Sequence, residues 1–463
     1  MKRIVLCFDG TWNALSKQEE LTNIVRLANL VTVESDGVNQ ISYYNSGVGS
    51  GGPIDRFLGG AFGVGLKSNV KRGLMFLALN YDAGDELYLF GFSRGAYTAR
   101  ALAGVIGTAG IPIDIGKTEV HWNLYQQIAK LRPKASLPEN SPKRKAADSA
   151  IAQIREQLVP LSRNTDETGK KMVPVPITCV GVWDTVGAYG IPSGVGGLTA
   201  ISRMFTYWTR GFRDTHFGDT VKLGLHAVAV DERRRPFTPT FWTMRPKPAD
   251  PKAAAAADAS AKPPPVDQVW FAGVHSNVGG GYANCGLSDL ALAWMMAQIE
   301  EKTALRFNEE EAMKTVWPCS ACMLYRTSRW GWLNPLRSIL PEVPKEAGFW
   351  TFITRLLGRR RRGSTRINEQ VHWSVRERQQ WAATLVDEVG VSKYAPPNLR
   401  RQLKEYSKAL PLEVKLLDRS ARSWTCHCPL EKAKLPCQCA MRDLNALRAG
   451  STPSTKEPTS VAA

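Results

Sequence analysis

Short apolar segments alternate with helix-patterned segments along the first two-thirds of this sequence. Each apolar segment is rich in β-branched or aromatic residues and stops at glycine or aspartate, as buried parallel strands do; the segments are Ile4–Phe8, Glu86–Phe92, Ile177–Trp183 and Gln268–Val274, with Leu225–Val230 as a further candidate. Apolar residues at helical spacing fill the segments between them: Thr22–Val33, Val64–Asn80, Ala96–Ala109 and Leu287–Thr303. This alternation predicts an α/β fold with a mostly parallel sheet flanked by helices.

The composition suggests how the rest of the chain is organised. We expect the α/β domain over residues 1–302, a helical, basic region over 303–449 and a disordered tail over 450–463. Two stretches within the α/β domain, about 133–163 and 245–265, are rich in Lys, Pro and Ser or in Ala and Pro. Such compositions are typical of surface insertions and linkers, so neither stretch is expected to carry chemistry.

Charge and hydropathy limit the classes of partner and location. The 60 Lys and Arg residues outnumber the 42 Asp and Glu residues by 18, which favours polyanions such as an anionic membrane surface or nucleic acid. No apolar run approaches the ~18 residues of a membrane span. The run before Asp9 is shorter than the ~7–15-residue core of a signal peptide, so we expect synthesis in the cytoplasm without a classical secretion signal. Nine cysteines, an odd number, make a disulfide framework unexpected.

One motif predicts a nucleophile. Gly91-Phe92-Ser93-Arg94-Gly95 has the pattern G-x-S-x-G, and it directly follows a predicted strand and opens a predicted helix. At such an elbow the serine lies in a strained turn that exposes its hydroxyl, and the flanking glycines relieve crowding. Ser93 is therefore the predicted nucleophile.

A serine nucleophile requires a base and an orienting carboxylate. His275 follows the predicted strand Gln268–Val274 and precedes a glycine run, which makes it the predicted base. Asp184 follows the predicted strand Ile177–Trp183 and is the preferred acid, with Asp231 and Asp289 as alternatives. The carboxyl ends of parallel strands are where such sheets place their sites.

The turn after the first strand could complete an oxyanion hole. Backbone N–H groups of Gly10 and Thr11, together with that of Arg94 at the helix N-terminus, are the predicted donors. Asp9 in the same turn also resembles the carboxylate nucleophile or metal ligand of some phosphatases. No companion acidic cluster accompanies it in the sequence, so we expect no metal and no other cofactor.

Six motifs in this order carry a resemblance: FDGTWN, YYNSGVGS, GFSRGAYTAR, GVWDTVGAYG, AVDERRRPF and WFAGVHSNVGGGY. Together they resemble the α/β-hydrolase domain family that includes the phospholipase effectors of bacterial type VI secretion, the Tle-like lipases. The resemblance implies that residues 1–302 are a catalytic domain whose triad is Ser93, Asp184 and His275. It also implies a phospholipid substrate, export through the secretion machine, and a spike protein and a cognate immunity protein as partners. Asn277 departs from the aspartate that many relatives carry after His-Ser, which puts full activity in doubt.

The C-terminal third leaves two interpretations open. Phe349–Leu357 has apolar residues at helical spacing and is followed by the arginines 359–362, which suits either an anionic membrane interface or an ordinary amphipathic helix. Cys426, Cys428, Cys437 and Cys439 could bind a metal or be unpaired thiols, and the same choice applies to Cys319 and Cys322.

The motifs therefore predict a serine ester hydrolase, and the resemblance implies that it is a phospholipase of the A type acting at a membrane surface. The alternative is a non-catalytic basic module that binds membranes or nucleic acid on a hydrolase scaffold. The arginines carry no nucleic-acid-binding fold motif, so a nucleic-acid partner is not expected.

Overall fold

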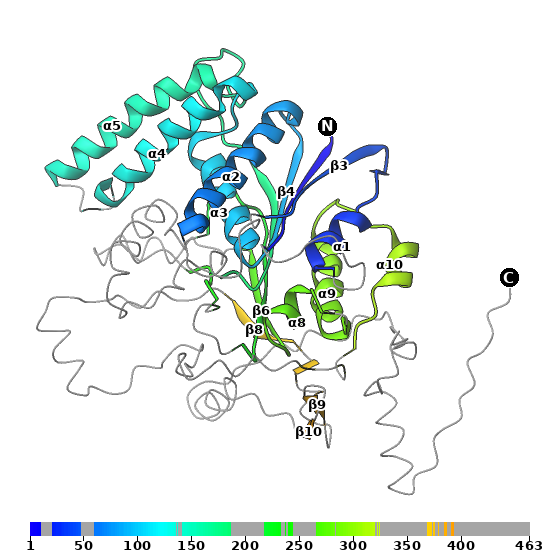
Figure 1. Cartoon of the computed structure of the whole chain (residues 1–463). Coiled ribbons are helices and arrows are strands. Elements are labelled where there is room, and N and C mark those ends of the chain that lie inside the picture. Colours follow the sequence, from blue (N-terminus) through cyan, green and yellow to red (C-terminus); the bar gives the residue numbers. More distant parts are fainter. Residues whose placement is uncertain are drawn as a thin grey trace, which may run out of the picture.

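A computed structural model of the chain describes the residues that build its central sheet and the helices around it (Figure 1). The described residues are 1–10, 21–47, 60–135, 137, 141–186, 217–232, 237, 239–243, 265–282, 284–319, 322, 324, 368–372, 374–375, 378, 384–386 and 390–392. The statements below concern these residues.

Strands and helices alternate, as the sequence predicts. The strands are β1 (Arg3–Phe8), β2 (Glu34–Ser35), β3 (Val38–Asn45), β4 (Glu86–Phe92), β5 (Ile177–Trp183), β6 (Gly224–Ala229), β7 (Val266–Phe271), β8 (Glu369–Val371), β9 (Thr384–Val386) and β10 (Gly390–Ser392). The α-helices are α1 (Asn23–Leu30), α2 (Gly60–Asn80), α3 (Arg94–Ala109), α4 (Thr118–Ala135), α5 (Pro142–Leu158), α8 (His275–Gly279), α9 (Gly286–Lys302) and α10 (Glu309–Thr315). Short 3₁₀ turns cover Ile115–Lys117 and Val159–Leu161.

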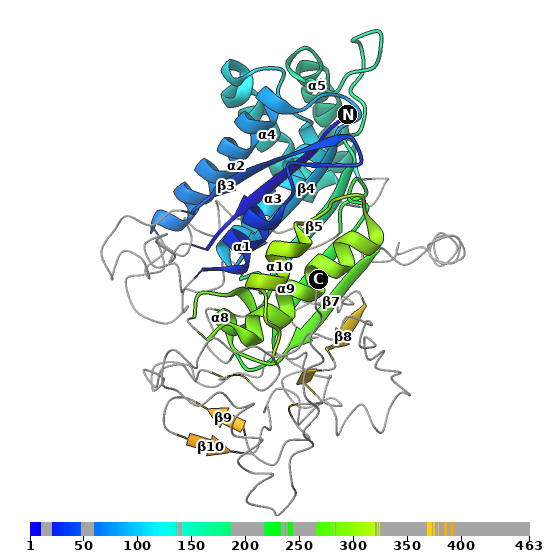
Figure 2. The ribbon, with the colours of Figure 1, turned by 90° about the vertical axis from the view of Figure 1, so that its right-hand side faces the viewer.

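The described strands form one large sheet of eight strands in the order β2-β3-β1-β4-β5-β6-β7-β8, and β9 and β10 form a separate antiparallel pair. Within the large sheet only the short edge strand β2 is antiparallel to its neighbour. Helices cover both faces: α2 and α3 lie on one side, and α1, α9 and α10 lie on the other (Figures 1 and 2). The prediction of an α/β-hydrolase-like, mostly parallel sheet flanked by helices is confirmed.

The central strands bury both faces, which explains why they appear in the sequence as continuous apolar runs. In β1, Ile4 and Leu6 join the apolar core beneath α2 and α3, whereas Val5 and Cys7 join the core beneath α1 and α9. Burial raises the pKa of the Cys7 thiol, so this thiol stays protonated and behaves as a small apolar side chain.

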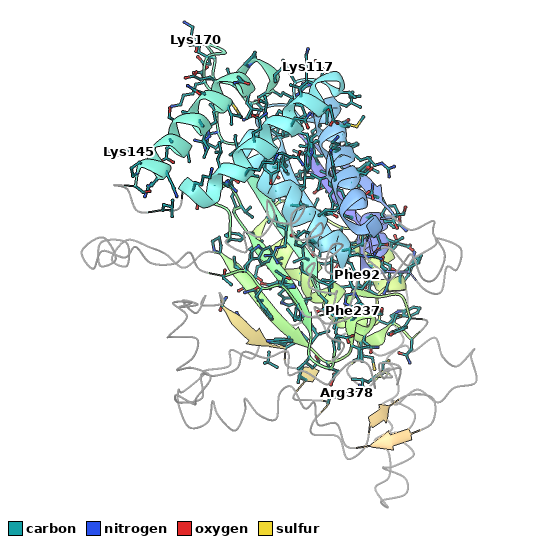
Figure 3. All side chains as sticks on the ribbon, turned by 60° about the vertical axis from the view of Figure 1, so that its left-hand side comes forward. Phe92, Lys117, Lys145, Lys170, Phe237 and Arg378 are labelled. Atoms are coloured by element: carbon teal, nitrogen blue, oxygen red, sulfur yellow. The ribbon has the colours of Figure 1, made fainter. Side chains whose placement is uncertain are left out.

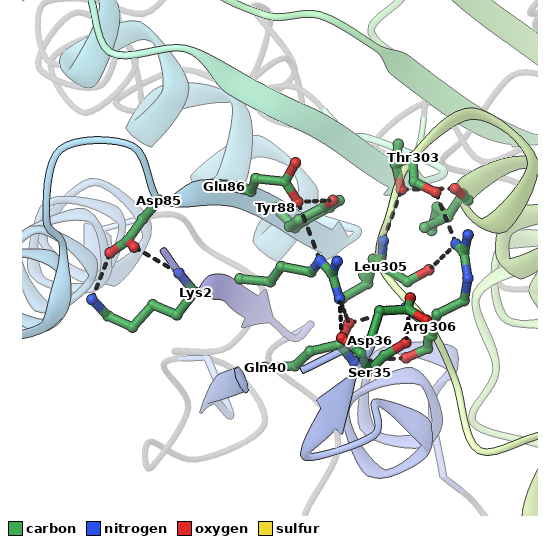
Figure 4. A network of polar contacts seen from close by, with 12 residues as sticks. Lys2, Ser35, Asp36, Gln40, Asp85, Glu86, Tyr88, Thr303, Leu305 and Arg306 are labelled. Carbon is green, nitrogen blue, oxygen red and sulfur yellow. Dashed lines mark hydrogen bonds and ion pairs between the residues drawn. The ribbon is translucent and has the colours of Figure 1, made fainter. Parts of the chain in front are cut away.

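A polar network closes the amino-terminal edge of the sheet, the edge opposite the carboxyl ends of the strands (Figure 4). Arg3 on β1 contacts Gln40 on β3 and Glu86 on β4, at 3.2 and 3.3 Å. The Gln40 side chain then bonds the backbone of Arg306, beyond α9. Lys2 Nζ lies 2.6 Å from Asp85 Oδ2, just before β4. These contacts tie β1, β3 and β4 to the helical layer at this edge.

The stretch 133–163 differs from the linker that its composition predicts. Most of it is the helix α5, which packs against α4 beyond α2 (Figure 1). Ala147, Ile154 and Leu158 are buried at roughly helical spacing. A minority of apolar residues in a Lys-rich segment is therefore enough to dock this helix. Lys117, Lys145 and Lys170, at the ends of this helical region, lie far from Phe92 (Figure 3).

The described part of the region after residue 302 contains short strands besides the helix α10. Most of 303–449 lies outside the described residues, so the mostly helical region expected there stays a prediction. Strand β8 pairs in parallel with β7 and extends the main sheet, and β9 and β10 form a hairpin. Without β8, the backbone of β7 would be an unpaired edge. The segments 245–264, Phe349–Leu357, 359–362 and 450–463 lie outside the described residues. None of the helices that the structure describes is both long and apolar enough to cross a membrane.

Candidate active site

Ser93 lies in a sharp turn between β4 and α3. Its φ and ψ of 56° and −118° fall in a region that residues other than glycine rarely adopt. The neighbouring glycines make the turn possible: a methyl group on Gly91 would lie 2.4 Å from the Gly95 carbonyl oxygen, and one on Gly95 would lie 2.0 Å from the Phe8 carbonyl oxygen. The G-x-S-x-G segment therefore forms the strand-to-helix elbow that the sequence predicts.

Asp184 directly follows β5, the strand beside β4, and it is fully buried. Its Oδ2 lies 2.6 Å from His275 Nδ1, and its Oδ1 accepts a hydrogen bond of 3.1 Å from the Ala229 N–H. Burial raises the pKa of Asp184, while the contact with His275 acts in the opposite direction. A histidine N–H at this position satisfies the carboxylate and fixes the orientation of the ring.

His275 begins α8 and does not itself end a strand. Strand β7 stops at Phe271, three residues earlier than the sequence predicts, and Gly273, with φ of 120°, turns the chain. The imidazole contacts two aromatic rings, Phe92 at 4.6 Å and Phe237 at 4.7 Å between ring centroids.

Phe92 joins the serine and histidine parts of the site. It precedes Ser93, its ring lies against His275, and Figure 3 shows it beside Phe237. A methyl group on Gly279 would lie 2.0 Å from the Phe92 ring, so only glycine lets α8 approach this closely. Among the described side chains, Ser93 and His275 are not hydrogen-bonded to each other; nucleophile and base often come into contact only when substrate binds.

The alternative acids are bound elsewhere. Asp231, after β6, accepts the Gly273 N–H at 2.7 Å. Asp289, on α9, pairs with Arg26 of α1 and accepts the Trp317 N–H at 2.7 Å. Of the three aspartates considered from the sequence, Asp184 is the one that the structure brings to the His275 imidazole.

The other described histidines have structural contacts. His121 Nε2 lies 2.8 Å from the Ala109 carbonyl oxygen, and burial lowers its pKa to about 4. His226 Nε2 accepts the Thr185 N–H at 3.2 Å. His372 contacts Ser374 at 2.8 Å, and burial lowers its pKa to about 3.

The turn after β1 lies beside Ser93, but one predicted oxyanion donor is already in use. A methyl group on Gly10 would lie 3.6 Å from Ser93 Cβ. The Gly10 N–H donates to Asp9 Oδ1 at 2.6 Å, and Asp9 Oδ2 accepts from Thr22 and Tyr44. Arg94 is the first residue of α3, and Thr11 lies outside the described residues. The buried Asp9 thus ties this turn to Thr22 and Tyr44.

No cluster of three or more His, Cys, Asp or Glu side chains suited to a metal occurs in the described part of the chain. Cys319 and Cys322 lie in this part as buried thiols. Cys426, Cys428, Cys437 and Cys439 lie outside it.

Residues 2–298 match the model of the family described as T6SS, phospholipase effector Tle1-like, catalytic domain. The chain belongs to this family. The match ends within α9, so the Tle1-like part contains the sheet up to β7 and every residue of the site described above.

Other proteins resemble parts of this Tle1-like chain. The uncharacterized protein YEL023C of Saccharomyces cerevisiae is 29% identical over 262 residues, which cover 53% of this chain and 33% of that protein. This chain thus matches about a third of the length of that relative. An uncharacterized protein from Pseudomonas aeruginosa has a crystal structure that is 21% identical with a TM-score of 0.35, covering 66% of this chain and 47% of that one. The structure of the Tle1 effector bound to the VgrG spike of the type 6 secretion system is 17% identical with a TM-score of 0.30, covering 61% of this chain and 51% of that one.

Two residues of the Tle1-like site have roles that the sequence did not predict. Glu232, fully buried after β6, accepts the His275 backbone N–H at 3.3 Å. Asn277 Oδ1 lies 3.3 Å from the Val274 backbone nitrogen and accepts its N–H. Both act on the turn that carries His275. Asn277 lies beside this turn in sequence, whereas Glu232 is separated from His275 by more than forty residues, so no local pattern could show its contact.

Proposed function

We propose that this chain is a serine hydrolase that cleaves a carboxylic ester of membrane phospholipids, as a phospholipase of the A type. The observation that carries the proposal is the 2.6 Å contact between Asp184 and His275, at the same edge of the sheet as the strained Ser93 turn. The family description supplies the substrate class, because Tle1-like proteins are described as phospholipase effectors.

In this mechanism His275 Nδ1–H donates to Asp184, which leaves Nε2 as the base. Nε2 takes the proton of Ser93 as Oγ attacks the ester carbonyl carbon. The tetrahedral intermediate collapses, His275 returns the proton to the departing alcohol, and the lysophospholipid leaves. Water activated by His275 then cleaves the acyl-serine ester, releases the fatty acid and restores the serine hydroxyl.

The oxyanion needs donors at the Ser93 turn. The Arg94 N–H begins α3, where the helix dipole favours negative charge, so we assign it as one donor. Thr11 remains the second predicted donor. Gly10 can contribute only if Asp9 releases its N–H.

The test is fatty-acid release from mixed phospholipid vesicles by the full chain and by Ser93→Ala. Ser141→Ala is the matched control, because Ser141 precedes α5 and makes no capping hydrogen bond with its side chain. We expect release by the parent and by Ser141→Ala, and loss of about 10⁴-fold or more in Ser93→Ala.

Other results would change the proposal in defined ways. Cleavage of short esters that depends on Ser93, without release from vesicles, would keep the serine chemistry and remove the lipid assignment. If neither substrate is cleaved, the non-catalytic membrane-binding module becomes the better account, and vesicle binding by the Ser93→Ala variant would test it.

Family membership extends the proposal beyond the site. We propose export by a type VI secretion machine, with the spike protein and a cognate immunity protein as partners and the target-cell membrane as the place of action. Co-purification of the full chain with a spike protein tests the partner assignment, and failure to co-purify would count against it.

A further inference from the structure

The turn before His275 is held by side chains on three successive backbone N–H groups. The N–H of Gly273 donates to Asp231 Oδ2, that of Val274 to Asn277 Oδ1, and that of His275 to Glu232 Oε2. Most turns are stabilised by hydrogen bonds between backbone groups. In this turn three side chains accept the backbone N–H groups, so its conformation depends on the identity of those three residues.

Two of the three acceptors come from one place. Asp231 and Glu232 come two and three residues after the end of β6, the strand that pairs with β7. Asp231 makes a reciprocal contact with Gly273: its carboxylate accepts the Gly273 N–H at 2.7 Å, and its own N–H donates to the Gly273 carbonyl oxygen at 3.0 Å. The segment after β6 is therefore bound to the turn through both the N–H and the carbonyl oxygen of Gly273.

Glu232 reaches the histidine itself. It is fully buried, and its Oε2 accepts the His275 N–H at 3.3 Å. Removing a carboxylate from water costs several kcal/mol of stability unless hydrogen bonds compensate for the lost hydration. The hydrogen bond from the His275 N–H gives the buried Glu232 carboxylate one such compensating contact. Burial is the main cause that raises the pKa of Asp184, and the charge of Glu232 acts in the same direction.

We propose that Asp231 and Glu232 are positioning residues, which fix the turn so that the imidazole of His275 meets Asp184. The inference rests on the proposed function for its activity readout, but the geometry of His275 can be measured without it. Neither residue touches the reacting atoms, so their effect passes through the histidine. In this proposal the AVDERRRPF motif supplies the two residues that position His275, and its Asp231 is not the acid of the triad.

Two variants distinguish the contribution of the side-chain length of Glu232 from that of its negative charge. Glu232→Gln keeps the length of the side chain and an acceptor oxygen but removes the charge. Glu232→Asp keeps the negative charge, but its side chain is one methylene shorter, so the carboxylate oxygens lie farther from the His275 N–H. Asp166→Ala is the matched control, because Asp166 also accepts backbone N–H groups, those of Lys170 and Lys171, in an exposed turn away from the site.

The first readout is the downfield proton resonance of His275 Nδ1–H, identified by its absence in His275→Gln. We expect this resonance in the parent, in Glu232→Gln and in Asp166→Ala, and its loss or broadening in Glu232→Asp. The second readout is ester hydrolysis: kcat of Glu232→Asp falls by about 10- to 100-fold with KM within about twofold, and Glu232→Gln stays within about threefold of the parent. Thermal unfolding of each variant shows that the comparison is made on folded protein.

The proposal is overturned if Glu232→Asp keeps both the resonance and kcat, or if Glu232→Gln loses as much as Glu232→Asp. A parent with no Ser93-dependent hydrolysis would defeat the proposed function instead, and the resonance would still decide whether Glu232 holds His275.

Discussion

The turn that presents Ser93 and the turn that presents His275 are built in opposite ways. The serine turn is held by close backbone packing, since Gly91 and Gly95 leave no room for a side chain. In the histidine turn, backbone N–H groups donate hydrogen bonds to the side chains of Asp231, Glu232 and Asn277. The two glycines of the first turn lie within five residues of each other in sequence, although Gly95 also packs against Phe8 of β1. The second turn depends mainly on contacts across more than forty residues.

This difference predicts different failures. Damage to the serine turn should disturb the packing of α3 on β1 and lower the stability of the whole domain. Damage to the histidine turn or to its acid should leave the fold in place and reduce the chemistry. The predictions below challenge this division, from the largest expected effect to the smallest.

Asp184→Asn is expected to lower kcat/KM for ester hydrolysis by about 10⁴-fold, about 5.5 kcal/mol of transition-state stabilisation, while the variant stays folded. The amide keeps the shape of the carboxylate but cannot stabilise the imidazolium or hold the required tautomer. Steady-state kinetics and circular dichroism on the same samples check both parts. A loss below about tenfold would mean that another acid, such as Glu232, serves His275.

Gly95→Ala is expected to lower the free energy of unfolding by at least about 3 kcal/mol, because the new methyl group would meet the Phe8 carbonyl oxygen at 2.0 Å. Gly104→Ala on the same helix is the matched control: Gly104 is exposed, and nothing lies within 4 Å of the added methyl group. This control should gain about 0.5–1 kcal/mol from helix propensity. Urea unfolding measures both, and equal values would show that the elbow is not tightly packed.

Asp184→Asn should also change how stability depends on pH. Burial raises the pKa of Asp184 in the folded chain above the ~3.9 of an unfolded aspartate, so the ionised form costs stability at neutral pH. That cost is absent below the unfolded pKa, appears as pH rises through the folded pKa, and is complete above it. The variant should therefore be more stable than the parent at pH 7, and this difference in the free energy of unfolding should close toward pH 4 in a urea unfolding series. A gap that widens on acidification would contradict the direction of the shift.

Asn277→Asp is expected to change kcat/KM by no more than about threefold, because an aspartate oxygen can still accept the Val274 N–H. Asn277→Ala, which removes the acceptor, should lower activity more. Kinetics of the two variants side by side make the comparison. A gain of tenfold or more in Asn277→Asp would mean that the asparagine limits this chain, as its departure from the family pattern suggests.

Much of the fold is readable from the sequence because its signals are local. Strands β4 and β5 have the predicted bounds, since a run buried on both faces shows no polar interruption. Strand β3 was not predicted: it lies near the edge of the sheet, is only partly buried, and mixes Asn and Gln with its apolar residues. Strand β8 is only three residues long, too short for a pattern, and β7 supplies its partner.

The features of the candidate site likewise fall into those that local sequence predicts and those that depend on contacts between distant residues. Ser93 could be predicted because glycines two residues before and after it indicate a turn that is too crowded for side chains at those positions. Asp184 and His275 could be proposed because each follows a strand, although the choice of acid needed the 2.6 Å contact. The use of the Gly10 N–H by Asp9, and the support of His275 by Glu232, depend on which backbone group each carboxylate meets in space. No spacing in the sequence encodes that.

The most direct test of the account is labelling of the full chain with a fluorophosphonate, which reacts with an activated serine, followed by mass spectrometry of the labelled peptide. We expect one label, on Ser93, that is lost in His275→Ala and in Asp184→Asn but kept in His121→Gln, whose histidine lies on α4 away from the site. A label that survives in His275→Ala, or one that falls on a different serine, would contradict the assignment of Ser93, Asp184 and His275 as one catalytic unit.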